Sequence, residues 1–595
     1  MNKIHAPENA THCSEFMTEI PKGIVNKVIC GCGITSLAIE NQYPTVIVVP
    51  TVEIINNKVK QYPNDRYSYQ LFGVSGRDDV SNVEYYLKSL ESTGSNIPAK
   101  IIVTYDSFFK VAQLIQRDES NYRIVVDEFS ELLDAYDYRS QAIDLLLGHL
   151  EKFSYVSYVS ATPIDSKYYP TQLQNLDETE IIWSNKPQIK VLPCYTPHSY
   201  AFAACIIENY RIAGEHGLLM SNGHHSHAAY FFLNSVSGIK YILDRAGLPP
   251  EMVRVICATT EHNKDKLGGY TIGSALEPEK KFNFITCKAF KGADFYSESG
   301  AVFIVTNPRN KYTMISIDTD VVQIAGRIRN ATNPFKNIVH HIYDVDDSLL
   351  SREEFTKLVE EKTVETNNLL SAFSKCSPDE YKSVVKPHKE QSEDTYLHFD
   401  HSGIATFNQL LVNCDWRKWE TSHAIYCDGN SFRQAYIDND FSVKTFHHDI
   451  IHRKDFEELC IAYIEGNVDR EYIAAREPLV QVAYASIGSE KMKALRYRKK
   501  EMQQAVYDNS PEILDSVERM VKNTFEVGES YTLSETKVML AKIYTALSVK
   551  KKAKATDLNN YFCTRDCKKR INGKSTGMME ILSAQSAKTV LLITD

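Results

Sequence analysis

Two glycines separated by one residue follow a short apolar run and precede an amphipathic segment, in the stretch NKVICGCGITSLAIE at residues 26–40. Glycine lets a backbone approach a ligand closely, and the first turn of a following helix offers free N–H groups and the positive end of its dipole. A hydroxyl in that turn could ligate Mg²⁺. A tight strand-to-helix turn without any ligand would use the same glycines. The pattern predicts a phosphate-binding loop formed by Gly31, Cys32, Gly33, Ile34, Thr35 and Ser36.

This loop lacks the lysine that usually precedes its Thr or Ser, because Ile34 occupies that position. Three explanations are open: a site that no longer binds nucleotide, nucleotide bound through backbone amides and Thr35 alone, or a lysine supplied from elsewhere. Lys27, four residues before Gly31, and Lys22 lie on the amino-terminal side of the loop. We expect nucleotide binding to be retained, because the other polar positions of such a site are present.

Two of these positions are the ends of apolar segments. RIVVDE ends in Asp127 and Glu128, and YVSYVSAT ends in Ser160, Ala161 and Thr162. An Asp at a strand end can hold Mg²⁺, and an adjacent Glu can polarise a water molecule. The simpler alternatives are an acid pair that caps a helix and a turn that precedes a proline.

A third set of polar residues lies in DVVQIAGRIRN, which contains Gln323, Arg327 and Arg329. Two arginines two residues apart cannot share one helical face. One of them can therefore face a phosphate while the other points elsewhere, as the work of an arginine finger requires.

The elements that position these residues follow an alternating pattern. Short Val/Ile-rich strands alternate with helical stretches in residues 1–190, and the pattern begins again in 191–348. Strands that are apolar on both faces and separated by helices indicate a parallel sheet covered by helices. The carboxyl ends of such strands form the edge where ligands bind. Residues 349–480 are predicted to be helical, with a solvated linker near 375–395.

Residues 481–595 form a basic C-terminal region with 20 Lys+Arg against 13 Asp+Glu, in a chain of net charge −9. A basic region on an acidic body suits phosphate backbones, and the alternative is a set of solvated helix faces. We expect Lys568, Lys569 and Arg570 to contact nucleic acid from a winged-helix-like arm. Cys563 and Cys567 are interpreted as helix-spaced thiols rather than as a metal site.

Composition argues against several protein classes. Hydrophobic residues make up 43% and charged residues 24% of the 595, which is typical of a soluble globular protein. No apolar run reaches the roughly 18 residues that cross a bilayer, and the N-terminus has no signal-peptide core. The 13 cysteines follow no repeated spacing, as expected of reduced thiols. We expect a cytoplasmic protein without a membrane partner.

The order of these marks resembles superfamily 2 (DEAD/DEAH-like) helicases over about residues 20–348. VVPTVEIINNK occupies the position of that family's motif Ia. Three further segments match motifs of that family: VTYDSF, LLMSNG and FITCKAFKGADF. The residues that match the family's motif positions are Thr104, Ser221, Thr286 and Asp294. The close spacing of Arg327 and Arg329 is nearer to the origin-binding-protein-like branch found in phages and mobile elements. The missing lysine is a departure that leaves hydrolysis in question.

The resemblance implies an α/β fold with two RecA-like parallel-sheet domains in tandem, followed by a mainly helical C-terminal region. It also implies a site between the two domains that takes ATP and Mg²⁺, with Thr35 and Asp127 at the metal. The expected catalytic residues are Asp127, Glu128, Gln323, Arg327 and Arg329. The expected nucleotide-binding residues outside the glycine loop are Lys27 and Asp294. The residues expected to couple the nucleotide to nucleic acid are Thr104, Ser160, Thr162, Ser221 and Thr286.

The expected function is an ATP-dependent helicase or translocase that acts on DNA rather than RNA. Phage or mobile-element replication in a host cytoplasm is the expected setting, with other replication or phage proteins as partners. The alternative is a catalytically degenerate helicase-fold protein that binds nucleic acid or forms part of a virion. A weaker alternative is a nuclease or restriction motor subunit.

Overall fold

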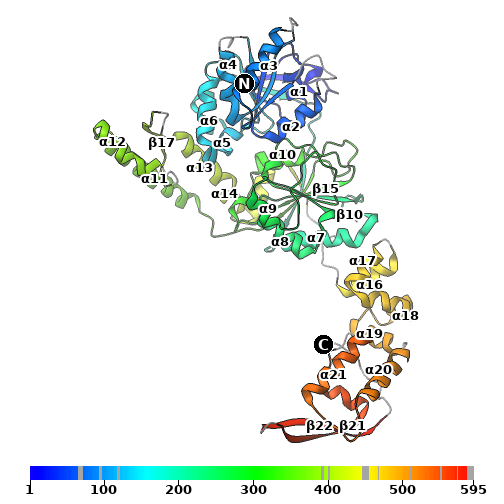
Figure 1. Cartoon of the computed structure of the whole chain (residues 1–595). Helices are drawn as coiled ribbons and strands as arrows, with labels where there is room; N and C mark the ends of the chain where they lie inside the picture. The colour runs from blue at the N-terminus through cyan, green and yellow to red at the C-terminus, as the bar shows by residue number, and fades with distance from the viewer. Residues whose placement is uncertain are drawn as a thin grey trace. The chain divides into compact units, whose positions relative to one another are not determined.

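The computed structural model describes residues 1–63, 71–92, 97–116, 121–389, 394–399, 402–444, 455–466, 468–508, 511–547, 549, 552–571 and 574–585. Two compact units form the chain. One comprises Met1–Ile207 and Leu219–Ile451, and the other comprises Glu208–Leu218 and His452–Asp595. The first unit contains two α/β domains, visible in blue to cyan and in green in Figure 1.

The first domain has an eight-stranded sheet in which every described pairing is parallel. In sheet order its strands are β1 (Asn2–His5), β8 (Glu178–Ile182), β2 (Gly23–Asn26), β7 (Val156–Ser160), β6 (Arg123–Asp127), β3 (Thr45–Val49), β5 (Lys100–Thr104) and β4 (Leu71–Val74). Its helices are α1 (Ile34–Glu40), α2 (Val52–Gln61), α3 (Val80–Ser92), α4 (Phe108–Ile115), α5 (Glu131–Asp134) and α6 (Tyr136–Leu150). The strand with Ser160 thus lies between the strand that enters the glycine loop and the strand that ends in Asp127.

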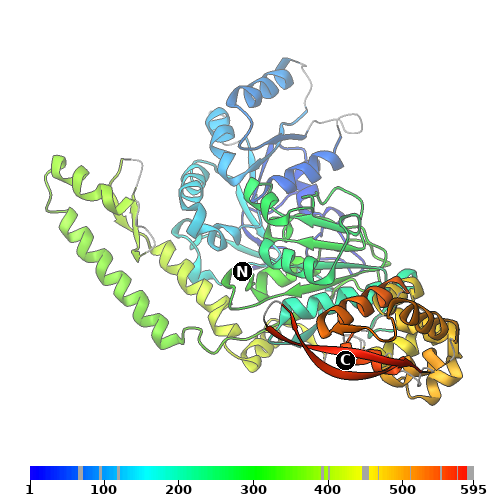
Figure 2. The ribbon, with the colours of Figure 1, turned by 60° about the horizontal axis from the view of Figure 1, so that its bottom comes forward.

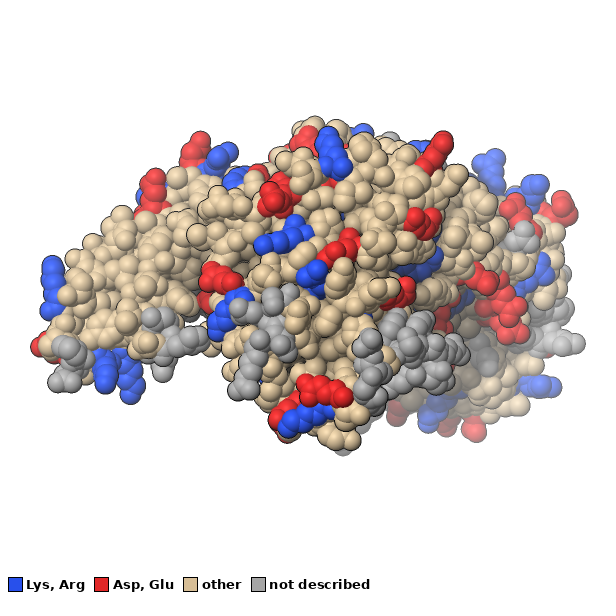
Figure 3. All heavy atoms as spheres, turned by 90° about the horizontal axis from the view of Figure 1, so that it is seen from above, with Lys and Arg blue, Asp and Glu red and all other residues tan. Residues whose placement is uncertain are grey.

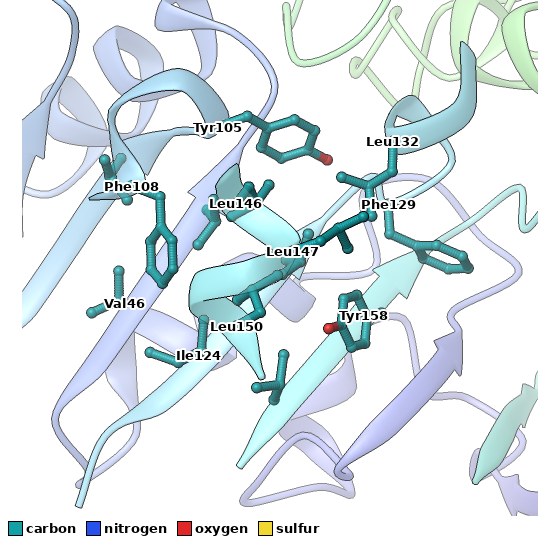
Figure 4. Packing of buried hydrophobic residues seen from close by; sticks show 14 of the residues in the cluster. Val46, Tyr105, Phe108, Ile124, Phe129, Leu132, Leu146, Leu147, Leu150 and Tyr158 are labelled. Carbon is teal, nitrogen blue, oxygen red and sulfur yellow. The ribbon is translucent and has the colours of Figure 1, made fainter. Parts of the chain in front are cut away.

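Both faces of this sheet are buried. Along β3, Val46 and Val48 belong to one apolar cluster, and Ile47 and Val49 belong to the cluster on the opposite face. Figure 4 shows the first cluster, in which Phe129 and Leu132 lie against Leu146, Leu147 and Tyr158. Because Phe129 directly follows the acid pair, this packing anchors the segment that carries Asp127 and Glu128.

The second domain has a seven-stranded parallel sheet. In sheet order its strands are β13 (Val253–Ile256), β14 (Phe282–Ile285), β12 (Ala228–Phe232), β15 (Gly300–Val305), β16 (Ile338–Tyr343), β9 (Lys190–Tyr195) and β19 (Ser442–Val443). Its helices include α8 (Val236–Ala246), α9 (Glu261–Leu267) and α10 (Val322–Ala325), and α7 (Ser199–Ala213) runs from this unit into the other. The edge strand β19 comes from the region predicted to be helical.

Residues between β16 and β19 form the helices α11 (Arg352–Phe373), α12 (Pro378–Val385), α13 (Gln409–Thr421), α14 (His423–Tyr426) and α15 (Gly429–Asp438), and the short hairpin β17 (Leu397–Phe399) and β18 (Ala405–Phe407). Helices α11 and α12 extend away from the two sheets in both ribbon views (Figures 1 and 2). The linker predicted near 375–395 is wrong in part, because α12 begins inside it. Ser377 and Glu380 form a capping box that starts this helix.

The second unit is mainly helical, with α16 (Phe456–Glu465), α17 (Arg470–Arg476), α18 (Pro478–Ala494), α19 (Lys499–Asp508), α20 (Pro511–Thr524) and α21 (Leu533–Ala546). It ends in an antiparallel sheet ordered β20 (Ser530–Thr532), β22 (Lys574–Ala584) and β21 (Phe562–Ile571). The prediction of helix-spaced thiols is wrong, because Cys563 and Cys567 lie on β21. The ten residues of this strand pair with β22, which buries Met579 and Ile581.

The predicted fold class is confirmed: two RecA-like parallel-sheet α/β domains in tandem are followed by a mainly helical C-terminal region. Among the described residues, no helix combines the length and the apolar character needed to cross a membrane.

Candidate active site

The glycine loop joins β2 to α1 through backbone conformations that favour glycine. Gly31 has φ of 79° and Gly33 has φ of 76°, and Gly33 is the residue that immediately precedes α1. A Cβ atom added to Gly31 would lie 2.2 Å from a guanidinium nitrogen of Arg329. The turn therefore favours glycine here, and an arginine of the second domain lies close to the loop.

Ile34 does not face this approach. Its side chain is 2% exposed and packs in the apolar cluster that contains Cys13, Cys32 and Leu37. The position that normally carries the loop's lysine therefore contributes to the core of the first domain. Within the loop and its first helical turn, Thr35 supplies a polar side chain to the site, and its hydroxyl donates to Asp127 Oδ2 at 2.9 Å.

Lys27 lies where β2 ends, and its ammonium reaches the acid pair. Lys27 Nζ is 2.9 Å from Asp127 Oδ1 and 2.9 Å from Glu128 Oε1, with all three residues buried. Burial lowers the pKa of Lys27, but the two carboxylates outweigh it and raise that pKa well above its usual value. Likewise burial raises the pKa of Asp127, while Lys27 and the Thr35 hydroxyl bring it below its usual value. The indole of Trp183 donates to the Lys27 carbonyl at 2.9 Å and fixes the backbone of this segment.

Glu128 is held from three elements at once. It has φ of 54°, an uncommon value for a residue other than glycine. Ser160 Oγ at the end of β7 donates to Glu128 Oε2 at 3.2 Å, and Gln323 Nε2 of the second domain donates to the same oxygen at 2.8 Å. Thr162 donates its backbone N–H to Ser160 Oγ at 3.0 Å. The carboxylate that would orient a water molecule is thus fixed by groups from both domains.

The two arginines of the second domain have different surroundings. Arg327 donates to the Gln323 carbonyl at 2.8 Å, to Gln323 Oε1 at 3.0 Å and to the Ala293 carbonyl at 3.1 Å. It therefore holds Gln323 in place. Arg329 forms an ion pair with Asp294 at 2.6 Å and reaches the glycine loop. Burial lowers the pKa of Arg327, whereas Asp294 outweighs burial and raises the pKa of Arg329.

The predicted coupling residues do not all lie in this cluster. Thr104 is buried just before Tyr105, whose hydroxyl donates to the Asp127 carbonyl at 2.8 Å. Thr286 is buried in the second domain and donates to the Ile256 carbonyl at 3.2 Å. Ser221 is exposed, in the turn between the two-residue strands β10 (Leu218–Leu219) and β11 (His225–Ser226).

Ser221 lies away from the site because the apolar run before it, Leu218 to Met220, is not a strand of the seven-stranded sheet. The strand of the seven-stranded sheet that follows in the chain is β12, and Asn234 comes shortly after its end. Asn234 Oδ1 accepts the N–H of Cys287, the residue next to Thr286. In the C-terminal unit Lys568 is exposed on β21, and the side chains of Lys569 and Arg570 lie outside the described residues.

Three cations near the site were not among the predicted residues. Lys58 of α2 donates to Gln61 Oε1 at 3.0 Å; burial lowers its pKa, and the nearby carboxylates of Asp294 and Asp127 oppose that effect. Lys58 ends the segment VVPTVEIINNK, so its place in a matched segment was a usable signal. Lys291 directly precedes Gly292 and forms an ion pair with Glu131. The sequence gives no sign of this pair, because only the fold brings the two residues together. The third cation is Arg417, which forms an ion pair with Asp318.

The donor set suits a magnesium nucleotide. Mg²⁺ in nucleotide sites takes one or two protein oxygens together with phosphate oxygens and water. Thr35 Oγ1 and Asp127 Oδ2 are two such oxygens, 2.9 Å apart, beside the glycine loop. Within the described part of the chain no cluster of three or more His, Cys, Asp or Glu could hold a metal ion by itself.

No protein-family model and no curated protein matches the sequence. Mss116p bound to ssRNA and AMP-PNP is 13% identical with a TM-score of 0.38, over 65% of this chain and 81% of Mss116p. S. cerevisiae Dbp5 bound to RNA and ADP BeF3 is 13% identical with a TM-score of 0.35, over 57% and 82%. The DUF1998 helicase MrfA bound to DNA and AMPPNP is 12% identical with a TM-score of 0.35, over 55% and 46%. At this identity, the roles of individual residues rest on the geometry of this chain itself.

Proposed function

We propose that this protein is an ATP-dependent nucleic-acid helicase or translocase. The observation that carries the proposal is one buried network at the carboxyl edge of the first sheet. In it the side chains of Lys27, Thr35, Asp127, Glu128 and Gln323 are joined by hydrogen bonds of 2.8 to 2.9 Å. Because Gln323 belongs to the second domain, the network depends on the relative position of two domains, as a motor driven by nucleotide requires.

Each residue of the network has a defined task in this proposal. Asp127 and Thr35 would hold Mg²⁺, and the ion would supply positive charge beside the transferred phosphoryl group. Glu128 accepts a proton from the attacking water and is kept in orientation by Ser160 and Gln323. Arg329 brings a second positive charge to the glycine loop, as an arginine finger does.

Lys27 replaces the lysine that the loop lacks. Its ammonium lies beside both catalytic carboxylates, whereas Ile34 is directed into the core. The Lys27 ammonium would offer the phosphates the positive charge that Ile34 cannot supply. The substitution at position 34 is then compatible with ATP hydrolysis.

The finer parts of the proposal rest on the sequence. DNA is favoured over RNA, and phage or mobile-element replication in a host cytoplasm is the proposed setting, because the Gly-Arg-Ile-Arg spacing resembles the origin-binding-protein-like branch. The basic C-terminal region supports nucleic acid as the partner, since Lys and Arg there outnumber Asp and Glu by 20 to 13. Other replication or phage proteins are the proposed further partners.

The test is nucleotide turnover with and without nucleic acid. We expect ATP hydrolysis stimulated by DNA, and a fall in kcat of about 100-fold or more in Glu128→Gln with ATP binding retained, because the general base is lost. Glu151→Gln, an exposed residue of the same domain, is the matched control and should leave kcat unchanged. Binding of DNA and ATP without turnover by the natural chain would contradict the enzyme and favour the catalytically degenerate alternative.

A further inference from the structure

Helix α13 lies in the chain between strands β16 and β19 of the second sheet, yet it packs on the first domain. It contacts α5 and α6. Cys414 is buried in the first domain's apolar cluster and donates to the Leu133 carbonyl at 3.4 Å. Asn408, which caps the helix, donates to the Tyr136 hydroxyl at 2.9 Å. A helix that the chain forms before the last strand of the second sheet is therefore built into the first domain.

Arg417 of this helix contacts both domains. Its guanidinium makes two hydrogen bonds, of 2.6 and 2.8 Å, to the two carboxylate oxygens of Asp318 in the second domain. Its Nε lies 3.7 Å from Asp134 Oδ1 in the first domain. The Arg417 side chain is 7% exposed, and those of Asp134 and Asp318 are 22% and 30% exposed.

The two contacted carboxylates lie directly next to the site in the chain. Asp134 ends α5, which begins three residues after Glu128. Asp318 is part of a π-helical turn, Ile317–Val321, that leads without a break into α10 and Gln323. Arg417 therefore connects the segment after the acid pair with the segment before the glutamine that touches Glu128.

The surroundings of Arg417 are short of positive charge. Lys291 forms an ion pair with Glu131 and lies 3.6 Å from Asp134 and 3.7 Å from Asp320. Two cations thus face four carboxylates, those of Glu131, Asp134, Asp318 and Asp320. Burial raises the pKa of Asp134 to about 6, with Lys291 and Arg417 opposing the rise and Glu131 and Asp320 adding to it. Without Arg417, one ammonium would remain to hold like charges from two domains together.

We propose that Arg417 is a positioning residue for the candidate active site, holding the acid-pair segment of the first domain and the Gln323 segment of the second in register. Helix α13 is then a third structural part of the site, outside both sheets. The coupling of these two segments through Arg417 does not depend on what the site does. Its effect on turnover rests on the proposed function.

The coupling is tested by hydrogen–deuterium exchange on the full chain. In Arg417→Gln we expect faster exchange, by about threefold or more, both in α5 and in residues 317–321, because each loses its counter-ion. Arg417→Lys keeps the charge and should restore part of the protection. Lys418→Gln is the matched control: Lys418 lies on the same helix but pairs with Asp137 of the first domain alone. Exchange at 317–321 that is unchanged in Arg417→Gln, or raised equally by Lys418→Gln, would overturn the proposal.

Steady-state kinetics then separates positioning from general destabilisation. We expect kcat of Arg417→Gln to fall about tenfold or more, with affinity for a non-hydrolysable ATP analogue changed less than about threefold, since Arg417 does not contact the glycine loop. Equal loss of affinity and kcat, with no rescue by Arg417→Lys, would mean a merely structural role. If the natural chain has no turnover, the proposed function fails, and the exchange experiment still decides the coupling.

Discussion

Lys27 and Ile34 differ in where their side chains lie relative to the acid pair. The strand-end residue here is charged and buried against two carboxylates, and the loop residue is apolar and buried in the core. Burial penalises a charge, and at Lys27 the two carboxylates outweigh that penalty. The acid pair therefore accounts for a charged Lys27 in a buried position, and contact of this ammonium with phosphate belongs to the proposed function.

Removing each side chain distinguishes the two roles. We expect Lys27→Ala to weaken ATP binding by about ten- to a hundredfold, because a charge-assisted hydrogen bond to phosphate is lost. Ile34→Ala should leave ATP affinity nearly unchanged and lower the free energy of unfolding by about 2 to 5 kcal/mol through lost packing. Calorimetric titration with ATP measures the affinities, and chemical denaturation measures the stabilities.

Ile34→Lys completes this comparison. Restoring the usual lysine would place a charge in the apolar cluster around Cys32 and Leu37, so we expect a loss of stability and no gain in ATP affinity. Equal and negligible effects of Lys27→Ala and Ile34→Ala on binding would mean that Lys27 does not contact the nucleotide. Higher affinity in Ile34→Lys would point instead to a degraded site that the lysine repairs.

For single residues, the sequence predicts those that lie at strand ends. It does not predict those whose partners are distant in the sequence. Asp127, Ser160 and Thr35 follow apolar runs or glycines, and the rule for parallel sheets brings them to one edge. Arg417 carries no such mark. It lies in an amphipathic helix 99 residues from its partner Asp318, and only the tertiary fold brings the two together.

Among the elements, β16 contains two histidines whose rings are buried. His341 is hydrogen-bonded with Thr306 and Tyr436, and His340 with the Val302 carbonyl. Burial lowers the pKa of His340 to about 4 and that of His341 to about 3. The unfolded chain would bind these protons near the ordinary pKa of about 6.5.

We therefore expect the second domain to lose stability as the pH falls. The unfolded state takes up protons between about pH 6.5 and 4 while the folded state does not, so the contribution of the neutral rings is complete above pH 6.5 and declines below it. For His340 alone the loss approaches about 3 kcal/mol near pH 4. Denaturant midpoints measured from pH 7.5 to 4.5 test this expectation.

His340→Gln is the variant that isolates the effect. Its stability should depend less steeply on pH than that of the natural chain, although the substitution lowers stability at pH 7.5. Exposed His262, on α9 of the same domain, supplies the control, and His262→Gln should leave the pH dependence unchanged. A dependence that is identical in all three proteins would mean that other groups govern the acid sensitivity.

Elements with a strong local pattern were predictable, and elements defined by a distant partner were not. Val/Ile-rich runs such as β3 and β6 stand out because both faces of the strand are buried. The strand β19 has two residues and exists only because β9 offers an open edge. The strand β21 contains Thr, Arg, Asp and Lys in place of an apolar run, and its strand conformation follows from pairing with β22.

For the whole molecule, the distribution of charge is the property that bears on the partner. On the face shown in Figure 3, acidic and basic side chains are interspersed rather than gathered in one field. The sequence, by contrast, concentrates basic residues after position 480. Removing residues 548–595 is a poor test of that region, because Leu558, Phe562 and Ile581 pack in the same apolar cluster as Leu540. Substitution of surface cations leaves this core intact.

The corresponding test is a triple substitution, Lys568→Gln with Lys569→Gln and Arg570→Gln, measured by the salt dependence of DNA binding. Each lost phosphate contact reduces the slope of log affinity against log salt by about 0.9 on duplex DNA and by about 0.7 on single strands. We therefore expect a slope that is shallower by about 1 to 3, with weaker binding that does not depend on base sequence. The control removes the same charge from the first unit, through Lys88→Gln, Lys264→Gln and Lys357→Gln, whose side chains are at least half exposed. Equal slopes for the two triple variants would mean that net charge alone governs binding. A slope that the first variant leaves unchanged would return this hairpin to the role of a solvated surface and place the nucleic-acid contacts elsewhere in the chain.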